Sequence, residues 1–315
     1  MPLQHRFPPL AGWALAFALG CGLTAALASV PRFLWSRWLP QLPDRVARDG
    51  YGVVVEAQAL QGVDQNISGL TYNEVTHTLF AVVNRPERVV ELDRCGRVLR
   101  ILPADFGDDL EAISHVEQDL FVIASERGNV IWGALVNGQT RHVLPMSSHT
   151  LAVSLNRSKN EGIEGMSWDH RHQRLFLANE KNPLKILEIS GFDRLVRGKP
   201  TSLSLKTWHD ERSLSDLAGD VSSISFNERW DAMTLLSQES RRIYRFDGKY
   251  QPFLLLQLER GHHGLKADVK QPEGLAFGPD GSVYVVAEPH LFYRFVPRAA
   301  FAATGVVVQP IEGCP

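Results

Sequence analysis

The sequence repeats one two-part unit five times, and this repeat limits the folds that the chain can adopt. Each unit opens with a polar residue, a small residue and an apolar residue, as in Ser68-Gly69-Leu70, Glu111-Ala112-Ile113, Glu164-Gly165-Met166, Ser222-Ser223-Ile224 and Glu273-Gly274-Leu275. Each continues with a short apolar run that ends in another polar residue, at Asn84, Glu126, Glu180, Glu239 and Glu288. The two polar positions of a unit lie 15 to 17 residues apart, and successive openers lie 43, 53, 58 and 51 residues apart.

A period of this length, made of short strands, is typical of β-propellers and other repeat arrays. The first unit continues with two more strand-like pieces, Arg88–Leu92 and Arg97–Leu102, joined by the turn Asp93-Arg94-Cys95-Gly96. Four short antiparallel strands make one propeller blade. The sequence therefore predicts an all-β, five-bladed propeller over residues 50–315. A six-bladed ring is the alternative if a degenerate blade lies in one of the two long gaps around the third unit, although we expect insertions there.

The two ends of the repeat region are predicted to close the ring together. Tyr51–Leu60 has a strand pattern but precedes the first opener, and the last unit supplies only three strands, ending at Leu291–Phe295. An amino-terminal strand that completes the last blade would leave only short free edges. Gly305–Gln309 is a further strand-like segment without a blade of its own.

The repeat also predicts where the acidic residues gather. Every opener precedes the innermost strand of its blade, so the openers should surround one mouth of the central channel. Glu111, Glu164 and Glu273 would converge there, with Asp220 close by. The closing residues would form a wider ring on the same face, made of Glu126, Glu180, Glu239 and Glu288. Like charges gathered in this way repel each other unless a cation or basic side chains neutralise them.

Calcium is the cation that such a ring suits, because it takes about six to eight oxygen ligands from carboxylates, carbonyls and water. We expect Glu111, Glu164, Asp220 and Glu273 to be the metal ligands, with neutral oxygens from Ser68, Asn66 or Ser222. The alternative is that these acids cap the innermost strands and pair with arginines such as Arg85, Arg127 or Arg241. For the outer ring, local ion pairs are the preferred interpretation. The histidines lack the paired spacing of a zinc site.

The amino-terminal region predicts a membrane anchor. No charged residue occurs from Phe7 to Pro31, and Leu10–Val30 is almost wholly apolar, which is about the length that crosses a bilayer as a helix. We expect residues 1–31 to be a signal anchor or transmembrane helix in the inner (plasma) membrane, and residues 32–49 to be a tether. A cleaved signal peptide with Ala26-Leu27-Ala28 at its end, or lipidation at Cys21, are the alternatives. Each places the bulk of the chain in the periplasm or outside the cell.

Three polar segments precede openers and should lie on the acidic face: the loops 147–160 and 262–270, and 208–219, which is a loop or a short helix. Long loops on one face favour recognition of a ligand or of an envelope protein. The net charge of -2 gives no reason to expect nucleic acid. The chain carries no Gly-x-Ser-x-Gly nucleophile motif, so we do not expect an enzyme. The alternative is a calcium-dependent hydrolase of esters, lactones or phosphoesters, with His263 or His290 as the general base. Cys95 and Cys314 either pair in an oxidising compartment or remain free thiols.

Five motifs together resemble the SdiA-regulated family, over residues 50 to 312. They are Ile67-Ser68-Gly69-Leu70-Thr71-Tyr72, Asn160-Glu161-Gly162-Ile163-Glu164-Gly165, Leu236-Ser237-Gln238-Glu239-Ser240, Gln271-Pro272-Glu273-Gly274-Leu275 and Ala287-Glu288-Pro289-His290-Leu291-Phe292-Tyr293. The resemblance implies a membrane-anchored bacterial envelope protein, whose five-bladed propeller is distantly similar to NHL repeats and holds calcium. Family members tend to carry Asn where this chain has His290.

Overall fold

The computed structural model describes the chain from Gly50 to Arg298, apart from short gaps. The described ranges are 50–107, 109–146, 150–153, 162–181, 183–209, 214–228, 230–246 and 251–298. The predicted anchor, tether and Gly305–Gln309 strand lie outside these residues. Among the described residues, none of the helices is both long and apolar enough to cross a bilayer.

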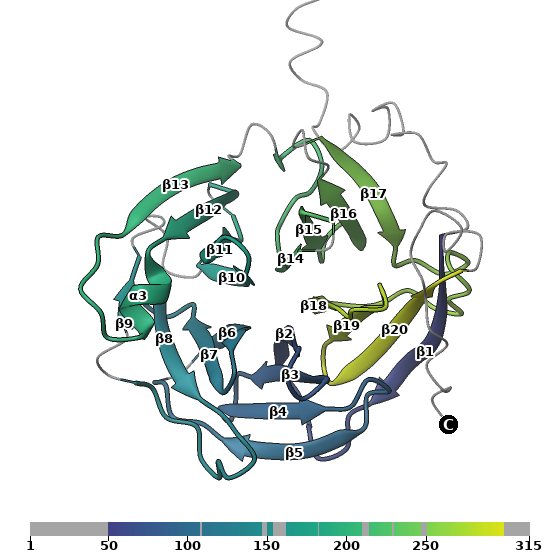
Figure 1. Cartoon of the computed structure of the whole chain (residues 1–315). Helices are drawn as coiled ribbons and strands as arrows, with labels where there is room; N and C mark the ends of the chain where they lie inside the picture. Colours follow the sequence, from purple (N-terminus) through teal and green to yellow (C-terminus); the bar gives the residue numbers. More distant parts are fainter. Residues whose placement is uncertain are drawn as a thin grey trace, which may run out of the picture. The chain divides into compact units, whose positions relative to one another are not determined.

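Five four-stranded antiparallel sheets stand around a central channel as the blades of a propeller (Figure 1). The innermost strands are β2 (Ile67–Asn73), β6 (Leu110–Glu117), β10 (Ile163–Asp169), β14 (Ser223–Asn227) and β18 (Pro272–Phe277). The second strands are β3 (Thr78–Val83), β7 (Leu120–Ser125), β11 (Arg174–Asn179), β15 (Ala232–Ser237) and β19 (Val283–Ala287). The third strands are β4 (Arg88–Leu92), β8 (Val130–Leu135), β12 (Lys185–Ser190), β16 (Arg242–Phe246) and β20 (Leu291–Pro297). The outermost strands are β5 (Val98–Pro103), β9 (Thr150–Ala152), β13 (Ser204–His209), β17 (Pro252–Gln257) and β1 (Tyr51–Ala59).

The first and last strands close the ring, as the sequence predicts. β1 pairs antiparallel with β20, from Tyr51 opposite Pro297 to Ala59 opposite Leu291, and it completes the fifth blade. The six-bladed alternative is wrong. The described parts of the long gaps around the third unit contain the short helix α3 (Phe192–Val196) and outer strands of ordinary blades.

The core is divided among the five contacts between neighbouring blades. The second strands are buried on both faces because each face packs against an adjacent blade, and this explains their uninterrupted apolar runs. One apolar cluster fills each contact. Phe80 and Phe121, for example, join the first two blades with ring centroids 4.7 Å apart. The core therefore stabilises the packing of whole blades around the channel.

The small residues of the opening triplets let adjacent innermost strands approach each other closely. A Cβ added at Gly165 would lie 2.8 Å from the backbone nitrogen of Ile224 in the next blade. One added at Gly274 would lie 2.8 Å from the Cβ of Leu70, and one at Gly69 would lie 2.8 Å from the carbonyl oxygen of Glu111. Since real Cβ atoms do not come this close to backbone, the glycines are needed by the packing around the channel.

Hydroxyl groups join the innermost strands of neighbouring blades to each other. An innermost strand has a ladder partner on one side only, so some of its N–H groups need an acceptor elsewhere. Side-chain hydroxyls of the preceding blade accept four of these N–H groups: Thr71 from His115 (3.1 Å), Ser114 from Trp168 (2.9 Å), Ser167 from Phe226 (2.8 Å) and Ser223 from Leu275 (3.2 Å). These bonds stabilise the wall of the channel.

Three local expectations need correction or completion. The segment predicted as a loop over 147–160 contains β9, and Trp208 belongs to β13 and not to a loop. The 262–270 loop is confirmed, because it contains no strand. Cys95 is disulfide-bonded. Its proposed partner, Cys314, lies outside the described residues.

The close approach of the strands can be tested by adding one methyl group. Gly165→Ala should destabilise the propeller by about 1–3 kcal/mol, because the new Cβ is too close to the backbone of β14. Thermal unfolding should show this as a decrease of several degrees. Gly138→Ala is the matched control, since nothing lies within 4 Å of its added Cβ. Equal unfolding temperatures for the two variants would contradict this account of the glycines.

Candidate metal centre at the channel mouth

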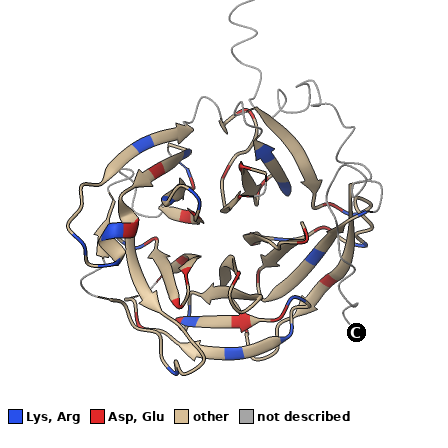
Figure 2. Ribbon diagram, in the orientation of Figure 1, with Lys and Arg blue, Asp and Glu red and all other residues tan. Residues whose placement is uncertain are grey.

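Three predicted acidic ligands occupy equivalent positions at one end of the channel. Glu111, Glu164 and Glu273 are the second residues of β6, β10 and β18. Acidic residues accordingly lie on the innermost strands of several blades in Figure 2. The charges of Glu111 and Glu273 both raise the pKa of Glu164, and the charge of Glu111 also raises the pKa of Glu273. The structure therefore brings these three side chains near one another.

Asp220, the fourth predicted ligand, has a hydrogen-bonding role within its own blade. It precedes β14, and its side chain is fully buried. One carboxylate oxygen accepts a hydrogen bond from the Ser237 hydroxyl at 2.5 Å, and both oxygens lie 3.2 Å from the backbone nitrogen of Glu239. It remains close enough to raise the pKa of Glu273. The position of Asp220 suits support of the ring, with Ser237 and Glu239 as its hydrogen-bond donors.

A tighter acidic cluster surrounds Glu111. Carboxylate oxygens of Asp109, Glu111 and Glu126 all lie within 4.8 Å of one another. The Asn84 side-chain nitrogen donates to Asp109 at 2.8 Å and to Glu111 at 2.7 Å. The Asn84 side-chain oxygen is buried and has no hydrogen-bond partner among the described residues. Three acidic side chains thus bring oxygen atoms close together, and the amide nitrogen of Asn84 faces two of them.

The electrostatics of the mouth favour a bound cation or bound protons. Burial, and then the charges of Asp109 and Glu126, raise the pKa of Glu111 to about 7, although hydrogen bonds from Ser68 and Asn84 oppose this shift. Burial and then Glu288 raise the pKa of Glu273 to about 9. Burial and the surrounding glutamates raise the pKa of Glu164 well above its usual value. Among the described residues, the carboxylates of Glu164 and Glu273 form no hydrogen bond and no ion pair. Their charge is therefore not neutralised by neighbouring basic groups.

The outer ring is partly neutralised by basic side chains. Lys181 Nζ lies 2.8 Å from Glu239 and 3.2 Å from Glu180, so it joins the third and fourth blades. Arg85 pairs with Asp109 at 3.2 Å, while Arg241 pairs with Glu259 at 3.3 Å instead of with the adjacent Glu239. Local ion pairs were expected for this ring, but of these four pairs only Lys181–Glu180 joins neighbours in the sequence. The described basic groups lie around the outer ring. The negative charge of the inner glutamates must therefore be neutralised by a bound cation or by protons.

The donor set fits a hard cation. It consists of oxygen atoms only, and calcium is bound in proteins by carboxylate and amide oxygens of this kind. The buried oxygen of Asn84 without a hydrogen-bond partner is the observation that most favours a cation, because a buried acceptor normally has a partner. Glu111 lies both in the inner ring and in the tighter cluster. It is therefore the residue on which a metal site at this mouth would depend.

Sequence reasoning missed Asp109 and the role of Asn84. Asp109 lies two residues before the Glu111 opener, and its positive φ of 70° turns the chain just before β6. Asn84 is the closing residue of the first unit, where the other units have Glu. Both residues could have been found by extending the repeat alignment by two positions and comparing the closers with each other.

The two histidines considered as general bases have hydrogen-bond partners outside this cluster. His263 is buried against Phe295 of β20, and its Nε2 accepts the N–H of Gln257, so its lone pair is occupied. Nδ1 of His290 donates to the carbonyl oxygen of Asp64 at 2.9 Å. Burial lowers the pKa of His263 to about 4. The geometry of His263 therefore does not suit proton abstraction at the channel mouth.

The raised pKa values predict how the stability of the calcium-free protein depends on pH. Between pH 4.5 and about 9 the folded chain binds more protons than the unfolded chain, since Glu111 and Glu273 titrate at higher pH when folded. Stability in the presence of a chelator should therefore decrease as the pH rises through this range. Glu273→Gln should flatten the decrease between pH 7 and pH 9, whereas Asp105→Asn, an exposed control, should not. A wild-type profile that is flat above pH 7 would contradict the assignment.

The fold and these residues can now be compared with known proteins. The model of the SdiA-regulated family matches residues 44–296. Among solved structures, the chain is similar to a calcium-binding protein, regucalcin, from Agrobacterium tumefaciens, with 12% identity, 82% of this chain and 96% of that chain covered, and a TM-score of 0.51. It is also similar to a gluconolactonase from Xanthomonas campestris, with 11% identity, 82% and 94% covered, and a TM-score of 0.49. These similarities concern the propeller fold, whereas the family match covers most of the chain. The chain belongs to the SdiA-regulated family.

Proposed function

We propose that this protein binds a calcium ion at the acidic mouth of its propeller and recognises a ligand or an envelope protein on the same face. The observation that carries the proposal is the cluster of Asp109, Glu111 and Glu126, whose carboxylate oxygens lie within 4.8 Å of one another. The amide nitrogen of Asn84 joins Asp109 to Glu111, and the buried oxygen of the same amide has no hydrogen-bond partner among the described residues. Glu164 and Glu273 of the neighbouring blades, whose pKa values are raised in the absence of a cation, would ionise when one binds and add negative charge.

Support for calcium over other cations comes from the chemistry of the donors. The cluster offers no thiolate or imidazole among its described side chains, and oxygen-only sites favour calcium or magnesium. Calcium tolerates irregular geometry and more ligands than magnesium. A regucalcin with a similar fold is itself described as calcium-binding, which agrees with the proposal.

Recognition is the activity that the face supports better than hydrolysis. A metal-dependent hydrolase needs a base near the metal as well as the ion. The lone pair of His263 is already occupied, as described above. A bound calcium ion would neutralise the inner glutamates and order the surrounding loops, and this prepares a surface for a partner.

Calcium should stabilise the propeller. At a calcium concentration a hundredfold above the dissociation constant, the gain is about 2.7 kcal/mol, which corresponds to a rise of several degrees in the unfolding temperature. The full chain, purified in a mild detergent, should show this rise between chelator and calcium. Glu111→Gln and Glu164→Gln should reduce or remove it.

Glu74→Gln is the matched control, because Glu74 follows the opposite end of an innermost strand and should leave the calcium effect unchanged. Isothermal titration of the same proteins gives the stoichiometry directly. A calcium effect that persists in both glutamine variants would place the ion elsewhere. The absence of an effect in the wild-type protein would leave the acids with a purely structural role, and the calcium proposal would be rejected.

We also propose that the amino-terminal segment holds the propeller at the inner membrane, with the propeller in the periplasm. The apolar stretch Leu10–Val30 supports this location. In a Gram-negative host, the full chain should stay with the membranes after an alkaline carbonate wash. Protease added to spheroplasts should digest the propeller while a cytoplasmic marker stays intact. Release by carbonate, or full protection from protease, would contradict this location.

A further inference from the structure

A disulfide lies where the first and the last blade of the ring meet. Cys95 is disulfide-bonded and half-buried in the turn Asp93-Arg94-Cys95-Gly96, which joins β4 to β5 in the first blade. The bond is formed within one chain, so the partner is another cysteine of the same chain. The identity of that partner decides which two parts of the protein the bond connects.

The turn that contains Cys95 packs directly on the fifth blade. Nη2 of Arg94 lies 2.9 Å from the Asp280 carboxylate, and its Nε donates to the hydroxyl of Tyr284 at 3.1 Å. Gly96, whose φ is 80°, lies against the ring of Phe292 in β20, and an added Cβ would overlap that ring. The turn is therefore held at the contact between the two blades that close the ring.

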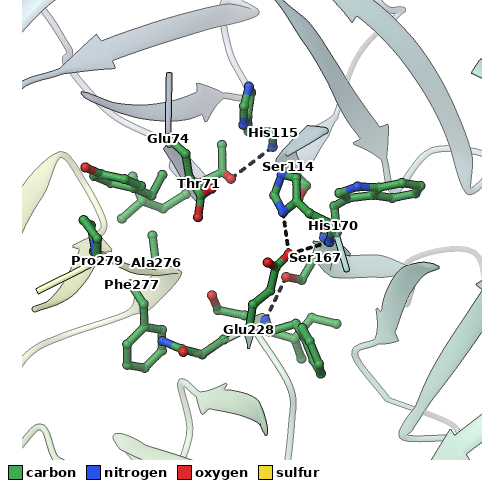
Figure 3. Close-up of a pocket in the computed structure, with 18 of the residues that line it drawn as sticks. Thr71, Glu74, Ser114, His115, Ser167, His170, Glu228, Ala276, Phe277 and Pro279 are labelled. Atoms are coloured by element: carbon green, nitrogen blue, oxygen red, sulfur yellow. Dashed lines mark hydrogen bonds and ion pairs between the residues drawn. The ribbon is translucent and has the colours of Figure 1, made fainter. Parts of the chain in front are cut away.

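The same contact supports one side of a cavity at the end of the channel opposite the acidic mouth (Figure 3). The cavity has a volume of about 380 Å³. Pro279 and Gly281, on either side of Asp280, line it. Tyr72 also lines it and stacks on Tyr284, with ring centroids 6.5 Å apart. A bond that fixes the turn would thus also fix residues directly behind this part of the wall.

The sequence contains two possible partners for Cys95, namely Cys21 and Cys314. Cys21 is unsuitable under each interpretation of the amino-terminal segment. In a membrane anchor over Leu10–Val30 its thiol would lie in the hydrocarbon core, and cleavage after Ala28 would remove it from the mature chain. Lipidation would convert the thiol to a thioether. Cys314 is therefore the partner that remains under all three interpretations.

The course of the chain brings its C-terminal segment to the correct side of the ring. Arg298, the last described residue, follows β20, and the turn with Cys95 follows β4. Both are third strands, in neighbouring blades, and corresponding strands of a propeller run in the same direction. Both segments therefore leave their blades on the side opposite the acidic openers. Cys314 is 16 positions beyond Arg298, which allows a reach of about 50 Å, whereas packed sheets lie only about 10 Å apart.

We propose that Cys95 and Cys314 are bonded to each other, so that the C-terminal segment forms a strap across the contact between the fifth and first blades. β1, which leads directly into the first blade, pairs with β20 through hydrogen bonds. The strap adds a covalent link between the same two blades. The proposal does not depend on the metal site.

The chemistry of the strap requires an oxidising compartment. Forming the bond joins two thiol sulfurs, releases two protons and passes two electrons to a protein disulfide, which becomes a dithiol. The periplasm contains such oxidants, whereas the cytosol keeps thiols reduced. A propeller made in the cytosol would therefore be closed by β1 and β20 alone.

The first test identifies the partner directly. The full chain is produced with export to the periplasm and purified in a mild detergent without reductant, and free thiols are blocked before digestion. Trypsin should release residues 95–97 linked to residues 299–315, because arginines precede and end the first segment and precede the second. Mass spectrometry should find this linked peptide, and it should disappear on reduction. A bond from Cys95 to Cys21, or to a second copy of the chain, would overturn the proposal.

The second test measures what the strap does to stability. Cys95 and Cys314 are 219 positions apart, and a disulfide that closes a long loop restricts the unfolded chain. In the presence of a chelator, reduction should therefore lower the unfolding temperature of the wild type by roughly 5–15 °C. Cys314→Ser should unfold at the lower temperature with and without reductant.

Two further variants separate the bond from other effects. Cys21→Ser is the matched control and should behave like the wild type. Cys95→Ser combined with Cys314→Ser should be no less stable than Cys314→Ser alone, since the same bond is lost in both. An unfolding temperature of the wild type that reduction does not change would overturn the strap. So would a Cys314→Ser variant that stays as stable and as sensitive to reductant as the wild type.

Discussion

The close contact of the five innermost strands is the constraint on which the rest of the structure depends. The strands come so close that Gly69, Gly165 and Gly274 have no room for a Cβ. Hydroxyl groups then supply the hydrogen bonds that a continuous sheet would have supplied. Because the blades are held at this distance, the residues at both ends of each strand converge on a channel mouth. The candidate metal centre is thus a consequence of this packing arrangement.

The opener of each unit combines two separate requirements. The small second residue serves the contact between strands, and the acidic first residue projects where the strands begin. Each acid therefore stands beside a position where bulk is excluded, and no large basic side chain from the neighbouring innermost strand lies between the acids. The basic groups that are described lie farther out, at Lys181 and Arg85. This separation explains why burial and mutual repulsion dominate the pKa values of the inner glutamates.

The sequence predicts the architecture well because the repeat determines the number of blades and how the ring closes. Period, strand alternation and the orphan strand Tyr51–Leu60 are sufficient for five blades and for ring closure. The convergence of Glu111, Glu164 and Glu273 also follows from the repeat. The contacts of Asn84 with Asp109 and of His170 with Glu228 do not follow from it, since each joins two blades and depends on side-chain directions that no period specifies. Asp220 shows the limit most clearly: its place near the mouth is predictable, but its hydrogen bonds to Ser237 and Glu239 are not.

Ring closure by β1 and β20 has a consequence for the order in which the protein forms. β1 leaves the ribosome before every blade, yet its partner strand is among the last segments of the propeller to be made. Four blades can assemble from contiguous sequence during synthesis, while the fifth must wait for a contact spanning almost the whole domain. Until then β1 has an unpaired edge, and the fourth and first blades each have an uncovered apolar face. A nascent chain interrupted before Leu291 would therefore be an unclosed ring of blades with an unpaired strand edge and exposed apolar faces. Export and quality-control factors would have to protect or remove such a chain, because these surfaces promote aggregation.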